Sequence, residues 1–222
     1  MNRMSTDEIV DHLTGELKPV KRTIPPILGT ALWLTASTAF IGALVWHHGM
    51  RPDIGRLLDD TGYRTLFAAC VATAALGALA TFMVSLPDRT VRWALLPMPG
   101  LVLWLAGTGI GCYADWVRAG PDGLVLGTSF SCMEWIISVS LPPVALLIVM
   151  IRHAAFVRPR LSLCLGMLST SALASAGLMM FHEIDATLMI FVWHTLAAVI
   201  LTGLAGISAP MFRRFAGVHW RR

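Results

Sequence analysis

Thiols, imidazoles and carboxylates gather around the ends of several long apolar segments of this chain. Cys112 and Asp115 close one such segment, Cys132 and Glu134 open the next, and His194 lies near the start of the last. Thiolate, imidazole and carboxylate groups together bind thiophilic or borderline metal ions, and thiols also react with oxidants. The candidate residues for sensing or binding are Cys112, Cys132, His182, Glu183, Asp185 and His194.

These residue types allow several chemistries. No pair has the His-x-x-x-His spacing of a helical metal site, so the sequence identifies neither a metal ion nor its ligands. Cys112 and Cys132 can form a disulfide in an oxidising compartment if their Cα atoms lie within about 7 Å, and Cys132 alone can act as a reactive thiol. Alternatively, Glu134 and His194 form buried hydrogen bonds that only fix helix packing. We expect both side chains to point into the protein, because each lies one or two turns inside an apolar segment.

Motifs of hydrolytic enzymes, such as Gly-x-Ser-x-Gly and His-Glu-x-x-His, do not occur, and we expect no catalytic activity. The polar groups are too few to line an aqueous substrate path. The competing class is a small membrane protein that binds a metal or haem and acts in redox or transport. A haem would require His47 or His48 to face His194. Cys70 and Cys164 lie inside apolar runs, where we expect small buried core residues.

The composition indicates a multi-pass membrane protein. Of the 222 residues, 56% are hydrophobic and only 14% are charged, against about 25% charged in soluble domains. An apolar run of about 20 residues crosses about 30 Å of hydrocarbon as a helix. The six runs of this kind are 27–46, 65–86, 94–112, 130–151, 161–181 and 188–209. The sequence therefore predicts an all-α bundle of six transmembrane helices.

The basic residues predict the orientation of these helices. Thirteen of the seventeen lysines and arginines fall in the two tails and in the second and fourth loops, and the other four are Arg51, Arg56, Arg64 and Arg118. The positive-inside rule then places both termini in the cytoplasm. We expect a cytoplasmic segment (1–26), a transmembrane domain (27–209) and a basic cytoplasmic tail (210–222). The net charge of +4 suits contact with anionic lipid headgroups rather than nucleic acid.

The N-terminal segment predicts a short amphipathic helix. Ser5 and Glu8 have the spacing of a capping box, and an apolar stripe follows that consists of Ile9, Val10, Leu13 and Leu17. A helix that lies on an anionic membrane would flank such a stripe with lysine and arginine, whereas this one carries acids. We therefore expect the stripe to bind a protein partner.

Several short motifs together are similar to those of a known family. They are Leu17-Lys18-Pro19-Val20-Lys21-Arg22, Met50-Arg51-Pro52-Asp53, Gly111-Cys112-x-Ala114-Asp115-Trp116, Ser131-Cys132 and Val192-Trp193-His194. The chain resembles the NrsF family over essentially its whole length. Members of this family are six-span bacterial inner-membrane proteins that act as anti-sigma factors for sigma F-type extracytoplasmic-function (ECF) sigma factors.

The resemblance implies that the N-terminal segment holds an ECF sigma factor at the inner membrane, away from RNA polymerase. A periplasmic stress signal, a metal or an oxidant, would release it. Cys132 matches one of two cysteines that the family uses for this response. The family's second cysteine belongs in the fifth loop, where this chain reads Phe181-His182-Glu183-Ile184-Asp185. Either Cys112 takes its place or the signal differs. We expect no resident cofactor, only a transient metal ion at the periplasmic face, and the protein can form homo-oligomers.

Overall fold

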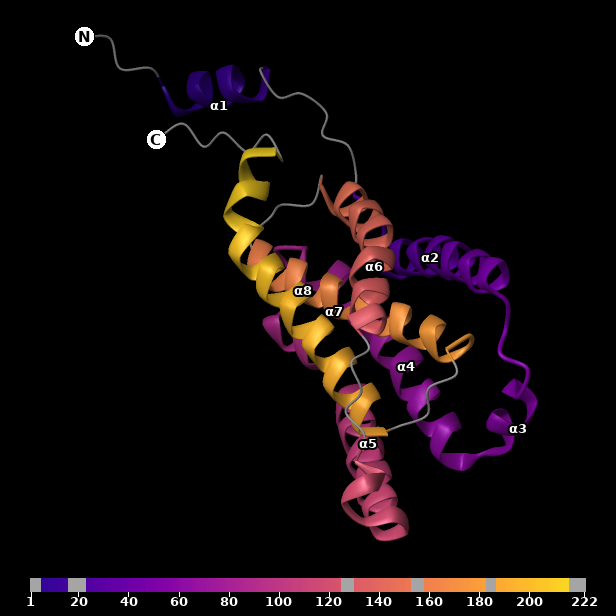
Figure 1. Ribbon diagram of the computed structural model, residues 1–222. Coiled ribbons are helices and arrows are strands. Elements are labelled where there is room, and N and C mark those ends of the chain that lie inside the picture. Colours follow the sequence, from indigo (N-terminus) through magenta and orange to yellow (C-terminus); the bar gives the residue numbers. More distant parts are fainter. Residues whose placement is uncertain (1–4, 16–22, 125–129, 153–157, 183–186, 216–222) are drawn as a thin grey trace.

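The described part of the chain contains helices and no strand. The computed structural model describes residues 5–15, 23–124, 130–152, 158–182 and 187–215. The helices are α1 (Thr6–Gly15), α2 (Pro26–His48), α3 (Ile54–Asp59), α4 (Thr61–Val84), α5 (Met98–Ala119), α6 (Phe130–Ile151), α7 (Pro159–Met179) and α8 (Thr187–Phe215), with the 3₁₀ turns η1 (Val91–Leu95) and η2 (Gly120–Gly123) on either side of α5. Figure 1 shows α1 apart from a bundle that is formed by the long helices.

Six helices in the described part are long and apolar enough to cross a membrane, namely α2, α4, α5, α6, α7 and α8. The prediction of an all-α bundle with six such helices is confirmed. The third predicted span, 94–112, lies within the apolar stretch Val91–Gly123, but its helix has different ends: α5 begins at Met98, after Pro97, and continues to Ala119. The Cys112–Trp116 motif therefore lies within α5 rather than after it. The short helix α3 was not expected from the sequence.

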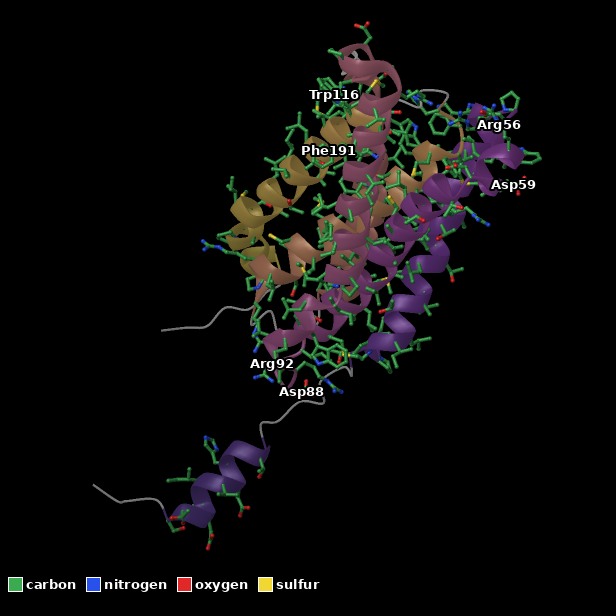
Figure 2. The ribbon with its side chains drawn as sticks, turned by 90° about the horizontal axis from the view of Figure 1, so that it is seen from below. Arg56, Asp59, Asp88, Arg92, Trp116 and Phe191 are labelled. Atoms are coloured by element: carbon green, nitrogen blue, oxygen red, sulfur yellow. The ribbon has the colours of Figure 1, made fainter. Side chains whose placement is uncertain are left out.

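The two ends of the bundle carry different loops. Figure 2 shows Arg56 and Trp116 toward one end, and Asp88 and Arg92 toward the other. The first end holds the α2–α4 connection, the C-terminal ends of α5 and α7, and the N-terminal ends of α6 and α8. In the same view, α1 lies beyond the end that carries Asp88 and Arg92. This alternation agrees with six successive crossings and with the predicted separation of the basic residues into two groups.

Helices α4 and α7 form the centre of the bundle, and their small side chains allow a close approach. The hydroxyl of Ser169 on α7 donates a hydrogen bond to the carbonyl of Ala74 on α4, and both residues are fully buried. Helix α2 attaches to α6 through Trp33, whose buried indole Nε1 donates to the carbonyl of Pro143 at 2.8 Å. Close packing of small residues and buried hydrogen bonds are the usual interactions between helices in lipid.

The glycines of α5 provide a test of the close packing between α5 and α4. A Cβ on Gly100 would lie 2.8 Å from the backbone nitrogen of Thr73 on α4, whereas a Cβ on Gly109 of the same helix would meet nothing within 4 Å. We expect Gly100→Ala to destabilise the protein by about 1–3 kcal/mol, because backbone cannot rotate away as a side chain can. The control Gly109→Ala should be neutral or slightly stabilising. Thermal unfolding in detergent compares them, and equal midpoints for the two variants would contradict the close α4–α5 contact.

Candidate functional site

The end of the bundle near Trp116 contains a cavity of about 650 Å³. Helices α4, α5, α6, α7 and α8 and the α2–α4 connection all contribute to its wall, most of which is apolar. Three of the predicted sensing residues, Cys132, His182 and His194, line it together with Asp115. Since these residues come from different helices, their convergence is a result of the fold.

A thiol and an imidazole are in direct contact in this cavity. The Sγ atom of Cys132 lies 3.2 Å from Nε2 of His182. Cys132 is the third residue of α6 and is 4% exposed. His182 follows the end of α7, where its backbone N–H donates to the carbonyl of Leu178 at 3.0 Å. This bond continues the last turn of α7 by one residue pair.

A second imidazole lies deeper in the same region. His194 is two turns into α8 and is 5% exposed, so the prediction that it points into the bundle is confirmed. Within the described residues, its Nδ1 is a buried atom that has no hydrogen-bond partner. Buried polar atoms are nearly always paired in proteins, by protein groups, water or a ligand. His194 therefore carries a buried polar atom that the described part of the chain leaves unpaired.

The prediction that Glu134 points inward was wrong, because its side chain is exposed. Two residues along an α-helix correspond to a rotation of about 200°, so Glu134 lies on the opposite side of α6 from buried Cys132. A carboxylate at this position faces outward, where headgroups and water can solvate it. Glu134 therefore does not belong to the cavity.

The other predicted sensing residues divide into two groups. Cys112 is half-buried on α5 and does not line the cavity, and each of the four cysteines is present as a thiol rather than in a Cys112–Cys132 disulfide. Glu183 and Asp185 lie outside the described residues. Within the described part of the chain, no three histidine, cysteine, aspartate or glutamate side chains are grouped as a metal site would require. The contact that the structure does provide is the Cys132–His182 pair.

Sequence reasoning gave Arg51 no structural role, although it counted this residue among the basic residues and in a family motif. Arg51 is 5% exposed and joins the α2–α3 loop to the end of α7. Its backbone N–H donates to the carbonyl of Met180 at 3.1 Å, and its Nη1 donates to the carbonyl of His182 at 2.9 Å. Its Nε and Nη2 donate to the two carboxylate oxygens of Asp53, at 2.7 and 3.1 Å. The Arg51-Pro52-Asp53 motif was the available signal, and we call this set of bonds the Arg51 clamp.

The clamp should be sensitive to acid. Its hydrogen bonds from Arg51 lower the pKa of the Asp53 carboxyl from its ordinary value of 3.8. A carboxylate with a lowered pKa in the folded protein stabilises it above the unfolded-state pKa, and this contribution disappears as the pH falls through the folded-state pKa. We expect wild type to unfold at a higher temperature than Asp53→Asn at pH 6, and the difference to shrink below about pH 4. A difference that is constant from pH 6 to pH 3 would contradict the ionised clamp.

One of the comparisons with known proteins agrees with the sequence motifs. The NrsF family model, described as negative regulator of sigma F, matches residues 13–215. Neither the curated proteins nor the solved structures gave a match. The matched range includes the whole bundle and all the residues of the cavity. The chain belongs to the NrsF family of negative regulators of sigma F.

Proposed function

We propose that this protein is an inner-membrane anti-sigma factor whose N-terminal segment, residues 1–26, binds an ECF sigma factor of the sigma F type. Family membership supports a sigma factor as the partner. The bundle anchors the segment, so that a bound sigma factor is kept at the membrane. The partner is a protein, with no direct contact to nucleic acid.

The observation that carries this proposal is the surface of α1. The helix starts with a reciprocal cap, in which the Ser5 N–H donates to Glu8 at 2.7 Å and the Glu8 N–H donates to the Ser5 hydroxyl at 3.2 Å. Ile9 is 43% exposed and Val10 is 49% exposed. The side chain of Leu13 and all of Leu17 lie outside the described residues. A capped helix with exposed apolar side chains is suited to the groove of a partner protein.

The cavity at the other end of the bundle is the proposed sensor. A signal that reaches Cys132 from the periplasm would disturb the Cys132–His182 contact and, through the Arg51 clamp, the loop that leads back to α2. Helix α2 follows the N-terminal segment directly. A change between two packings of the bundle can thereby alter how residues 1–26 are presented.

Co-purification tests the proposal. The full-length protein is isolated from its native membrane beside a form that lacks residues 1–24, and soluble partners are identified. A sigma factor that is captured only by the full-length form supports the proposal. If neither form retains a soluble partner, the proposal fails, and a Soret band or stoichiometric metal in the same preparations would favour the metal- or haem-binding class.

A further inference from the structure

Helix α6 contains two adjacent prolines in its second half, at a place where several features favour bending. Pro142 and Pro143 lack the backbone N–H that a helical residue donates to the carbonyl four residues earlier. Two consecutive carbonyls one turn before the prolines therefore lose their usual donors. The hydroxyl of Ser140 donates to the carbonyl of Ile136 at 2.6 Å, an interaction that also bends helices. The backbone of α6 is thus weakest around its two prolines.

The part of α6 that follows this weak place is fixed to two neighbouring helices. The buried indole of Trp33 on α2 donates its Nε1 hydrogen to the carbonyl of Pro143 at 2.8 Å. One turn further along α6, the side chain of Leu147 is fully buried and occupies the space beside Gly166 of α7, where an added Cβ would overlap with it. The hydrogen bond and this close packing hold the C-terminal part of α6 in place.

The part of α6 before the prolines carries Cys132, whose Sγ lies 3.2 Å from Nε2 of His182. At 1.5 Å per residue, Cys132 is about 16 Å along the helix from Pro143. A bend of about 10° at the prolines would therefore displace Cys132 by about 3 Å. Since hydrogen bonds weaken steeply beyond their usual lengths, such a displacement would break the contact with His182.

We propose that Pro142 and Pro143 form a hinge in α6 and that the hydrogen bond from Trp33 holds this hinge in its observed position. Trp33 lies two turns after Pro26, the first residue of α2, so the hinge connects the cavity to the end of α2 that follows the N-terminal segment. The Arg51 clamp reaches the opposite end of the same helix. That the hinge controls a bound sigma factor rests on the proposed function, whereas the hinge itself does not.

Trp33→Phe tests the hinge, because it keeps an aromatic ring and removes the indole N–H. The purified full-length protein is treated with N-ethylmaleimide, and peptide mass spectrometry follows the labelling of each cysteine over time. We expect Cys132 to be labelled about three- to tenfold faster in the variant, the factor by which one hydrogen bond between membrane helices shifts an equilibrium. Buried Cys70 on α4 and half-buried Cys112 on α5 should keep their wild-type rates. Equal acceleration at Cys70 would show that the variant loosens the whole bundle, and would overturn the proposal.

A second variant, Pro142→Ala with Pro143→Ala, restores the two missing N–H groups. We expect it to slow labelling of Cys132 by about fivefold, since two backbone bonds then oppose bending, and Trp33→Phe to have no further effect in this background. Ser37→Ala is the matched control on α2, because Ser37 lies one turn after Trp33 on the same buried face and its hydroxyl has no partner among the described residues. This control should leave the rate unchanged. If Trp33→Phe acts equally with and without the prolines, or in neither background, α6 has no such hinge.

Retention of the sigma factor is measured on the same preparations before labelling. If the wild type holds a sigma factor but Trp33→Phe does not change labelling of Cys132, the hinge is wrong and the anti-sigma function stands. If the labelling rates follow the expected pattern but the wild type retains no sigma factor, the proposed function is wrong and the hinge stands.

Discussion

Leu13→Asp is expected to release the sigma factor from the membrane. Leu13 lies between Ile9 and Leu17 on the apolar stripe, so it is the position where a carboxylate would disturb a partner most. Losing a buried leucine costs about 1.5–3 kcal/mol, and the new carboxylate must also be desolvated without a counter-ion. Since about 1.4 kcal/mol is a tenfold change in Kd, we expect binding to weaken by at least about 100-fold. The measurement is the share of sigma factor that sediments with membranes carrying each form.

Gly15→Asp is the matched control, because it adds the same charge to the same helix. Gly15 lies near Asp11 on the polar side of α1, and a Cβ there would meet nothing within 4 Å. We expect this variant to retain the sigma factor like the wild type. If both variants release it equally, total charge rather than the apolar stripe controls binding. If Leu13→Asp retains it, the stripe is not the binding surface.

The sequence was most informative where one physical requirement dominates. A helix in lipid must satisfy its own backbone hydrogen bonds and must be about 20 residues long, so the six spans could be read from apolar run length. The cap of α1 was also readable, because Ser5 and Glu8 interact over three residues of sequence. Run length located the third span but not the ends of its helix, because α5 begins only after Pro97.

The candidate site could be predicted only in part. Topology brings Cys132, His182 and His194 to one end of the bundle, and this much followed from the order of the spans. Which way a side chain faces depends on the rotation of its helix, which no run length fixes, and Glu134 was misjudged for this reason. The contact between Cys132 and His182 joins residues 50 positions apart, so it emerges only from packing.

Arg51 shows a further reason why sequence reasoning falls short. An arginine in a loop beside a membrane usually reports orientation, and four such residues were counted together on this side of the bundle. One of them, Arg51, is buried and binds two backbone carbonyls and a carboxylate, while Arg56 in the adjoining helix α3 has a side chain that is 80% exposed. Burial shows that Arg51 holds the structure together, whereas an exposed arginine only marks which side of the membrane its loop lies on. The sequence of an irregular loop does not show which of its residues are buried.

The clamp therefore predicts that the same substitution, arginine to glutamine, changes the stability of the protein much more at Arg51 than at Arg56. Both arginines bond Asp53, Arg51 through two nitrogens and Arg56 through one at 3.2 Å. We expect Arg51→Gln to destabilise the protein by about 2–3 kcal/mol, because it removes charge-assisted bonds from a buried position. Arg56→Gln should cost less than about 0.5 kcal/mol, as is usual for exposed pairs. Thermal unfolding of both variants in detergent measures the difference.

The same pair of variants links stability to the site. Because Nη1 of Arg51 holds the carbonyl of His182, Arg51→Gln should also loosen the imidazole that touches Cys132 and change the rate at which a maleimide labels Cys132. Arg56→Gln should leave that rate unchanged. If Arg51→Gln lowers the unfolding temperature but not the rate at Cys132, the clamp supports the fold without positioning His182. If neither property differs between the two variants, Arg51 contributes no more than a surface charge, and the loop after α2 has no route by which to communicate with the cavity.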